Sequence, residues 1–313
     1  MDIAAGTTSS YPPSVNFHLW EPCNMRCRFC FATFQDVKQT VLPRGHLPRE
    51  QALVVVEQLA AAGFDKITFA GGEPTLCPWL GELIARAKQR GLTTMLVTNG
   101  SRLLQPGWLD AVGAYLDWVV LSIDSTDPRT HERMGRRIAG KVGRALSVEH
   151  YLAVAAELHR RNIRLKVNTV VTAENAEEDM GEFLLALRAE RWKVLQVLPV
   201  VGQNDGKVEP LLIDELTFHR YCTRHQRVAD AGICLVPEDN DDMTGSYAMV
   251  DPAGRFFDNT AGRYRYSRSI LDVGVATAWQ DIRFDARRFE ERGGIYDWNA
   301  PGDANLVRLR LPR

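Results

Sequence analysis

The sequence contains no long apolar run. Its longest apolar stretches are residues 53–64, which Glu57 and Gln58 interrupt, and residues 118–123, which have the length of a strand. Neither stretch reaches the roughly 20 apolar residues that a membrane-spanning helix requires. The sequence therefore gives no indication of a protein embedded in a membrane.

Net charge is also nearly absent. The chain has 38 Lys and Arg against 39 Asp and Glu, a net charge of −1 in 313 residues. Proteins that bind nucleic acid polymers or anionic membranes over a broad surface carry an excess of positive charge. We therefore expect neither partner, and a polyanion would have to bind in a local pocket. With 45% hydrophobic and 25% charged residues, the composition also excludes a mostly disordered or fibrous protein.

The N-terminus carries no recognisable targeting segment. Residues 1–10 are small and polar, and no basic stretch leads into an apolar run. Secretory signals and amphipathic membrane anchors both have such features. We expect residues 1–13 to form a flexible segment and the protein to be cytoplasmic.

Cysteines are few and unevenly spread. The chain has six, too few for a disulfide scaffold of this size. Three of them, Cys23, Cys27 and Cys30, fall within eight positions, and this clustering indicates a metal or cofactor site. The isolated cysteines, which we expect to be buried thiols, are Cys77, Cys222 and Cys234.

Apolar, β-rich runs alternate with amphipathic helical stretches, which is the pattern of βα units around a parallel sheet. The predicted strands are residues 15–19, 66–69, 93–98, 118–123, 164–170 and 192–198. The predicted helices are residues 48–62, 80–90, 106–115, 147–161 and 176–189. Six such units predict an α/β fold, a partial (βα)6 barrel over residues 14–200, with ligands at the carboxyl ends of its strands.

The pattern changes after Leu198. A loop rich in Gly, Asn and Asp precedes a predicted helix over residues 214–231, and a predicted hairpin of residues 247–250 and 255–258 follows around the turn at 251–254. No repeat or linker divides the chain. We expect residues 201–313 to form a C-terminal extension that caps the substrate pocket.

The cysteine cluster has the spacing Cys-x-x-x-Cys-x-x-Cys and directly follows the first predicted strand. Three thiolates at this spacing can hold three irons of a [4Fe-4S] cluster and leave the fourth iron open. The alternative is a zinc site with a distant fourth ligand such as His18 or His46. Zinc sites of this type usually pair two Cys-x-x-Cys units, and the sequence has no second unit, which favours the cluster.

At these residues the chain resembles the radical S-adenosylmethionine superfamily. The segment Gly71-Gly72-Glu73-Pro74 follows the second strand, where that superfamily holds the amino group of S-adenosylmethionine. Polar residues at the ends of strands three and four also match that superfamily. By the same resemblance, Arg136 corresponds to a partner of the cofactor carboxylate. The residues that the resemblance implies for cofactor binding are Phe29, Gly71, Gly72, Glu73, Asn99, Ser122, Asp124 and Arg136, with Ser101 beside Asn99.

Within that superfamily the chain is most similar to the viperin family, and more narrowly to its prokaryotic members, over residues 14–298. The stretches that carry this resemblance are 16–18, 29–31, 66–74, 191–194, 269–275 and 292–294. It implies abstraction of the C4′ hydrogen of a ribonucleoside triphosphate and loss of its 3′-hydroxyl, which gives a 3′-deoxy-3′,4′-didehydro nucleotide. Such a product terminates polymerase chains, and a role in antiviral defence follows by analogy.

The residues themselves indicate a polyanion pocket. Side chains alternate across a strand, so Lys166 and Asn168 share one face, as do Arg191 and Lys193. We expect these faces to point inward, because helices usually cover the outside of such a barrel. Unpaired buried charge is costly, and a triphosphate would satisfy it, with Lys66 adding a further cation. The predicted substrate residues are Asn16, Lys66, Lys166, Asn168, Arg191, Lys193 and Tyr247.

Tyr247 corresponds to a viperin tyrosine near the sugar, and we expect it to be the catalytic residue that donates a proton or a hydrogen as the hydroxyl departs. The expected partners are CTP, UTP or GTP and an electron donor such as flavodoxin or ferredoxin, and we expect a monomer. The amphipathic helix and the final tryptophan of vertebrate viperins have no match in the sequence, so we do not expect their membrane attachment or their cluster-loading route. Segment 257–260, in the base-facing region, differs from theirs, so base preference stays open. The alternatives are a radical enzyme acting on a peptide or other metabolite, and a non-catalytic iron–sulfur or zinc module.

Overall fold

The computed structural model describes residues 11–140 and 143–299. Its strands are β1 (Ser14–Trp20), β2 (Lys66–Gly71), β3 (Thr93–Thr98), β4 (Trp118–Ser122), β5 (Arg164–Val171), β6 (Arg191–Gln196), β7 (Cys234–Glu238), β8 (Met249–Val250), β9 (Arg255–Asp258) and β10 (Arg265–Ser269). Its α-helices are α1 (Gln35–Thr40), α2 (Arg49–Ala61), α3 (Leu80–Gln89), α4 (Trp108–Val112), α5 (Pro128–Arg133), α6 (Val148–Arg160), α7 (Gly181–Leu187), α8 (Glu215–Arg224), α9 (Gln226–Asp230), α10 (Asn240–Met243), α11 (Ile270–Trp279) and α12 (Ala286–Glu291).

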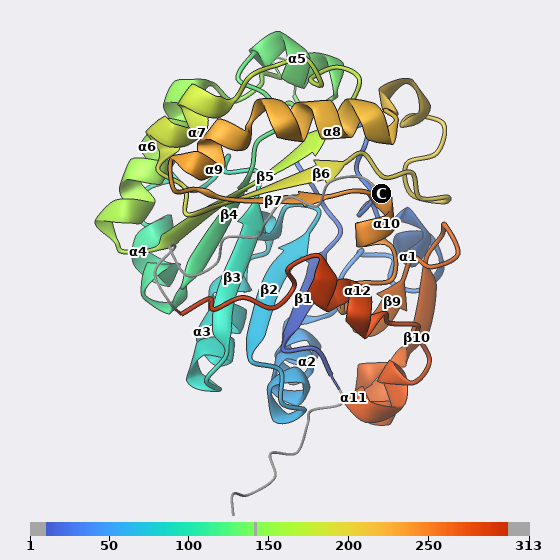
Figure 1. Ribbon diagram of the computed structural model, residues 1–313. Coiled ribbons are helices and arrows are strands. Elements are labelled where there is room, and N and C mark those ends of the chain that lie inside the picture. Colours follow the sequence, from blue (N-terminus) through green and yellow to red (C-terminus); the bar gives the residue numbers. More distant parts are fainter. Residues whose placement is uncertain (1–10, 141–142, 300–313) are drawn as a thin grey trace, which may run out of the picture.

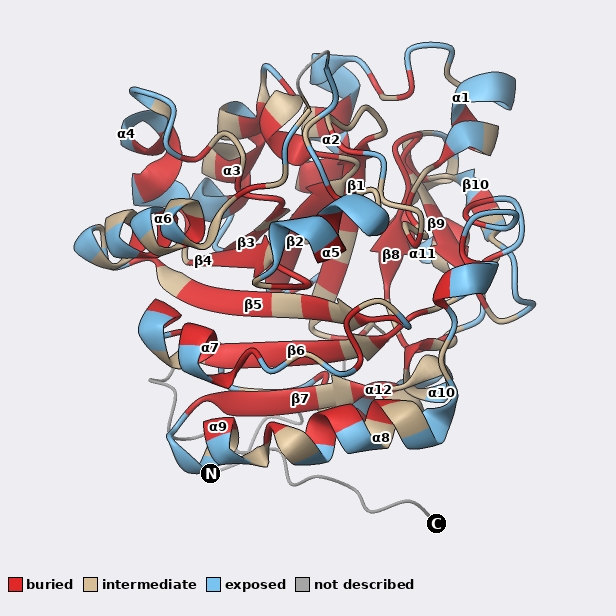
Figure 2. Ribbon diagram, turned by 90° about the horizontal axis from the view of Figure 1, so that it is seen from above, coloured by how far each residue is buried: buried red, intermediate tan, exposed pale blue. Residues whose placement is uncertain are grey.

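All ten strands form one sheet in the order β10-β9-β8-β1-β2-β3-β4-β5-β6-β7. Strands β1 to β7 are parallel to their neighbours, and β8 also lies parallel to β1. The sheet curves around an interior, with helices along its outer side (Figure 1). The carboxyl ends of the parallel strands therefore meet along one edge, where α5 lies (Figures 1 and 2). The predicted partial barrel is confirmed.

The six predicted strands correspond to β1 to β6, each within two residues at its ends. The predicted hairpin forms β8 and β9, which pair antiparallel around the turn Asp251–Gly254, where Gly254 N donates to Asp251 O at 3.0 Å. The helix predicted over residues 176–189 begins only at Gly181, because Asp179 Oδ1 accepts from Gly181 N at 2.8 Å. The helix predicted over 214–231 is two helices, α8 and α9, divided at His225, whose ring bonds to Tyr221 O.

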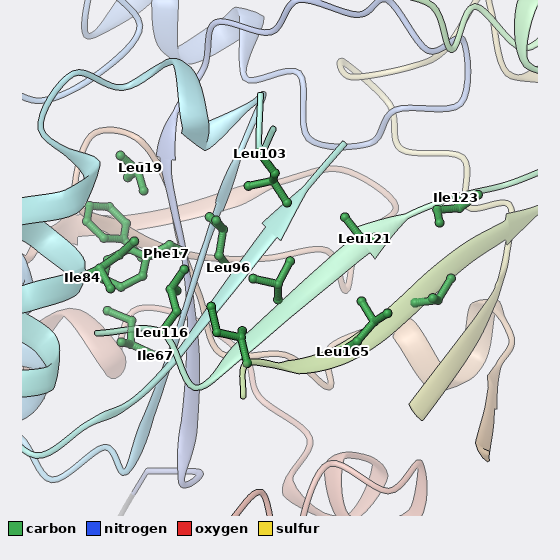
Figure 3. Close-up of a cluster of buried hydrophobic side chains, with 14 of the residues drawn as sticks. Phe17, Leu19, Ile67, Ile84, Leu96, Leu103, Leu116, Leu121, Ile123 and Leu165 are labelled. Carbon is green, nitrogen blue, oxygen red and sulfur yellow. The ribbon is translucent and has the colours of Figure 1, made fainter. Parts of the chain in front are cut away.

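The core lies between the strands and the outer helices. Alternate side chains of β1 to β5 point into it, among them Phe17, Ile67, Leu96, Leu121 and Leu165 (Figure 3). The residues between them point to the inside of the barrel, for example Asn16, Lys66 and Lys166. The period of two along each strand therefore separates an apolar outer face from a polar inner face.

The C-terminal region adds β7 to one side of the six-stranded unit and β8 to β10 to the other. Residues 293 and 294, after α12, line the interior cavity together with Phe289 and Arg292. Residues 1–10 and 300–313 lie outside the described part of the chain, so the predicted flexible N-terminus falls largely there. Among the described residues, none of the helices is long and apolar enough to cross a membrane.

Candidate functional site

The three clustered cysteines lie on the loop that follows β1. Cys30 N donates to Cys27 O at 3.2 Å, and Met25 N donates to Cys23 Sγ at 3.4 Å, so backbone bonds shape the loop. Burial raises the pKa of Cys23 and of Cys27 to about 12, and the neighbouring thiol Cys30 adds to both shifts. Three thiols held together in this way need a strongly positive partner to become thiolates, and a metal centre provides one.

The described residues contain no group of three or more His, Cys, Asp or Glu with the geometry to hold a single metal ion. The two histidines considered for a zinc site have other surroundings. His18 is buried among the rings of Phe31, Phe34 and Phe257. His46 stacks on Trp20 at 3.9 Å between ring centroids. Among the described residues no further side chain is grouped with the three thiols as a metal ligand, and the spacing of the thiols is the one expected for an iron–sulfur cluster with one open iron.

Gly71 and Gly72 bring the end of β2 against the backbone that leads into the cysteine loop. Gly71 has φ +152, and a Cβ there would lie 3.0 Å from Trp20 N. A Cβ on Gly72 would overlap the carbonyl oxygen of Glu21 and lie 2.6 Å from that of Pro22. Only glycine permits this approach, which leaves open a backbone cradle beside the cysteines.

Glu73 is buried and fully engaged. Its carboxylate accepts from Thr75 N at 3.0 Å, Thr98 Oγ1 at 2.7 Å and Asn99 N at 2.8 Å. Burial raises its pKa, and these hydrogen bonds oppose that shift. Glu73 therefore ties the end of β2 to the end of β3 and fixes the Gly71–Gly72 backbone.

Asn24, which sequence reasoning did not single out, links the cysteine loop to the end of β3. Asn99 Nδ2 donates to Asn24 Oδ1 at 2.9 Å, and Asn24 Nδ2 donates to Ser101 Oγ at 2.9 Å. The structure thus brings Asn99 and Ser101 together beside the cysteines. The position of Asn24 between Cys23 and Cys27 in the sequence could have identified it as a residue of this site.

The end of β4 carries a buried ion pair. Arg136 Nη1 lies 3.0 Å from Asp124 Oδ2 and 3.9 Å from Cys27 Sγ, and Arg136 Nη2 donates to the carbonyl oxygen of Ser122. Arg136 Nε has no hydrogen-bond partner among the described residues. A buried guanidinium with an unused donor beside the cysteines fits a carboxylate ligand such as that of S-adenosylmethionine. Phe29 is buried nearby against Met134 and other apolar side chains.

Every predicted substrate residue lines one interior cavity of about 170 Å³. The side chains come from β1, β2, β5, β6 and the segment before β8. They are Asn16, Lys66, Lys166, Asn168, Arg191, Lys193 and Tyr247. The prediction that these side chains face inward is confirmed.

Three of the cavity's cations have no carboxylate partner within ion-pair distance in the described part of the chain. Lys66 donates to Tyr296 Oη at 3.1 Å, Arg191 contacts Cys234 Sγ at 3.1 Å, and Lys166 has neither an ion pair nor a hydrogen bond there. Burial, and to a smaller extent the charge of Arg191, lowers the pKa of Lys66 to about 7. Asn168 Oδ1 and Arg191 Nε are buried without hydrogen-bond partners among the described residues.

Lys193, the third lysine of the cavity, belongs to a network that sequence reasoning missed in part. Lys193 forms an ion pair with Glu238 of β7 and donates to Tyr247 Oη at 2.9 Å. Arg292 lies 3.0 Å from Glu238, and its guanidinium covers the Tyr247 ring at 3.7 Å. Burial alone would raise the pKa of Glu238, but the two cations and the hydrogen bonds lower it to about 2.

The cavity therefore holds five cations, Lys66, Lys166, Arg191, Lys193 and Arg292, and none of the described residues that line it is acidic. Glu238 behind them is the carboxylate that pairs with Lys193 and Arg292. Burying this much positive charge is unfavourable without an anionic ligand. Arg292 lies in the stretch 292–294 that matched the viperin family, which was the signal for it.

Comparison with known proteins is consistent with this geometry. Residues 20–187 match the profile of the radical SAM superfamily. An S-adenosylmethionine-dependent nucleotide dehydratase of Flammeovirga pacifica is 52% identical over 91% of this chain and 96% of its own length. A protein of the same description from Lacinutrix mariniflava is 50% identical over 94% of this chain, which spans 60% of that relative.

A solved structure shares the fold. The crystal structure of Streptococcus suis SuiB bound to S-adenosylmethionine has a TM-score of 0.61 and 17% identity, covering 79% of this chain and 60% of that chain. The chain therefore belongs to the radical S-adenosylmethionine superfamily and, within it, to the S-adenosylmethionine-dependent nucleotide dehydratases, as its resemblance to the viperin family predicts.

Proposed function

We propose that this chain removes the C4′ hydrogen and the 3′-hydroxyl of a ribonucleoside triphosphate, CTP, UTP or GTP, and so forms the 3′-deoxy-3′,4′-didehydro nucleotide. The observation that carries the proposal is the excess of buried cations over carboxylates in the barrel interior. A triphosphate matches this excess in charge. The names of the relatives support a nucleotide substrate, and they do not support a peptide substrate or a non-catalytic module.

The polar side chains of the cavity that have no carboxylate partner can bind the phosphates in different ways. Arg191 has a free Nε and can offer a forked pair of donors to one phosphate. Lys66 and Lys166, on β2 and β5, supply point charges from two directions, and Asn16 and Asn168 add neutral polar groups. These contacts anchor the triphosphate inside the barrel, so that the ribose lies toward the carboxyl ends of the strands and the cysteine loop.

The cofactors fit the residues above the cavity. Cys23, Cys27 and Cys30 are suited to hold a [4Fe-4S] cluster, and the backbone at Gly71–Gly72 with Arg136 is suited to hold S-adenosylmethionine. When bound, this pair supplies a one-electron cleavage whose 5′-deoxyadenosyl product removes a hydrogen atom. The protein's own part is to fix the distance between this site and C4′ of the ribose and to keep water out.

We assign to Tyr247 the supply of the proton that the leaving hydroxyl needs to become water. Burial raises its pKa well above the ordinary value, so the phenol stays protonated at neutral pH. Its hydroxyl donates to Glu238 and accepts from Lys193 Nζ at 2.9 Å, and the proton can be replaced from Lys193. After hydrogen removal and loss of water, one further electron from the external electron donor completes the balance and gives the C3′–C4′ double bond.

Mass spectrometry of the products tests this proposal. The protein is reconstituted anaerobically with iron and sulfide and incubated with dithionite, S-adenosylmethionine and each of the four ribonucleoside triphosphates separately. We expect 5′-deoxyadenosine together with a nucleotide lighter by one water from at least one triphosphate. The variant Lys166→Met removes one unpaired cation of the cavity, and we expect it to lower product formation at least tenfold. Cofactor cleavage without a dehydrated nucleotide from any triphosphate would contradict the proposal.

A further inference from the structure

A group of arginines surrounds the outer side of the cysteine loop. Arg26 and Arg28 lie between the cysteines in sequence, and Arg137 lies in the segment after α5. These three side chains line one surface hollow together with Glu132 and the backbone of residues 138–140. Arg144, which is exposed, lies alongside because its carbonyl oxygen accepts from Ile138 N at 3.0 Å. We refer to Arg26, Arg28, Arg137 and Arg144 as the arginine patch.

Backbone contacts hold the patch directly against the cysteine loop. Arg28 N donates to Met134 O at 2.9 Å, and Ala139 N donates to Asn24 O at 2.7 Å. Arg26 donates to the carbonyl oxygens of Cys23 and Met25, with the second bond at 2.8 Å. The patch is therefore separated from the three cysteines only by the residues of the same short loop.

The arginines of the patch have no ion-pair partner among the described residues, which distinguishes them from many other arginines of this surface. Arg133, only a few residues away, pairs with Glu174 at 2.6 Å, and Arg268 pairs with Asp281 at 2.8 Å. In a chain of net charge −1, four such arginines around one loop form a local positive field. Such a field favours the approach of an acidic partner to this loop.

We propose that the arginine patch is the docking surface for an acidic one-electron donor protein of the flavodoxin or ferredoxin type. The inference rests on the proposed function, which requires one electron from outside for each cofactor cleavage. In the step, the donor is oxidised by one electron and the centre held by Cys23, Cys27 and Cys30 is reduced by one electron. The patch brings the donor to the shortest route to those cysteines, through the loop itself.

The first test is binding. Oxidised flavodoxin is titrated into the reconstituted protein at two ionic strengths, and the dissociation constant is measured for the wild type and for the double variant Arg137→Glu, Arg144→Glu. Neither side chain contacts a cysteine or lines the interior cavity. We expect affinity to fall at least tenfold in the variant at low salt, and its salt dependence to weaken. An unchanged dissociation constant would overturn the proposal.

The second test compares reductants. With flavodoxin as the electron source, the variant should cleave S-adenosylmethionine at least tenfold more slowly, whereas with dithionite its rate should stay within twofold of the wild type. The matched control is Arg220→Glu, Arg265→Glu, two exposed arginines on α8 and β10. A control that loses as much as the patch variant, or a patch variant that slows equally with both reductants, would contradict the proposal. This assay measures cleavage of S-adenosylmethionine and does not depend on a nucleotide product. Failure of the dehydration proposal would therefore be detected in the product assay and not here.

Discussion

Two buried lysines face the interior cavity with pKa values near neutrality. The pKa of Lys66 and that of Lys193 are lowered to about 7, mainly by burial and in part by nearby arginines, while Glu238 opposes the shift of Lys193. A bound triphosphate favours the charged form and must raise both values. Binding therefore takes up protons above pH 7, and affinity falls as the pH rises through the lysines' unliganded pKa.

We predict that the affinity for a ribonucleoside triphosphate is highest below pH 7 and falls by up to about tenfold per lysine for each pH unit above it. Calorimetry in buffers of different ionisation enthalpy should show uptake of one to two protons, roughly, at pH 8. The control Lys88→Met changes an exposed lysine that pairs with Asp117, and should leave the profile unaltered. Affinity that is constant from pH 6 to 9 would show that these lysines do not bind phosphate.

Tyr247 should separate binding from chemistry. In Tyr247→Phe the ring still packs under Arg292, so triphosphate affinity should change less than about threefold, whereas dehydration should fall about 100-fold. Cofactor cleavage should continue without dehydrated product, which chromatography of 5′-deoxyadenosine against the nucleotide product measures. Tyr264→Phe, which lines the same cavity and loses only a bond to Phe31 O at 2.8 Å, is the control. Equal losses in both variants would argue for a packing role.

Single residues were predictable where the strand period decides their orientation. Lys166, Asn168, Arg191 and Lys193 follow from alternation along two strands, and the structure confirms that they share the cavity. Glu238 was not predictable in this way. Its role depends on how β7 lies beside β6, which places it against Lys193, and this is a tertiary contact without a local signal.

At the scale of elements, the close approach of the β2 end to the segment before the cysteine loop depends on two glycines. We predict that Gly72→Ala lowers the free energy of unfolding by about 1 to 3 kcal/mol, because its Cβ meets the Glu21 and Pro22 carbonyl groups. It should also weaken S-adenosylmethionine binding at least tenfold, as measured by equilibrium dialysis of the reconstituted protein.

Gly91→Ala is the control for that variant. Gly91 has φ +83 with open space around it, so alanine there costs about 1 to 2 kcal/mol of backbone strain without touching the site. Its cofactor affinity should equal that of the wild type. If both variants bind S-adenosylmethionine normally, the Gly71–Gly72 backbone is not part of the cofactor site.

Strands β1 to β6 were predicted well, and β7 was not. Strands β1 to β6 are apolar runs between amphipathic helices, and their ends follow from the sequence within two residues. Strand β7 is only five residues long and contains Pro237, which argues against a strand. It forms because β6 offers a parallel edge. The tertiary sheet therefore overrides the local preference.

At the scale of the whole molecule, the barrel holds two groups of candidate site residues. The cysteine loop, Gly71–Gly72 and Arg136 lie at the carboxyl ends of the strands, and the cations occupy the interior. The architecture followed from the order of strands and helices, because right-handed crossovers leave few alternatives. The position of the C-terminal region did not follow from that order, because its strands join both edges of the sheet. Arg292 reaches the cavity only in the folded chain.

The proposed function requires the C4′ hydrogen to be the one that is removed, and an isotope measurement tests this selection most directly. The reconstituted protein is incubated with dithionite, S-adenosylmethionine and the preferred ribonucleoside triphosphate, deuterated in separate samples at C3′, C4′ or C5′, and the 5′-deoxyadenosine is analysed by mass spectrometry. We predict one deuterium transferred from the C4′-labelled nucleotide and none from the others. Transfer from C3′ or C5′, or no transfer from C4′, would contradict the account.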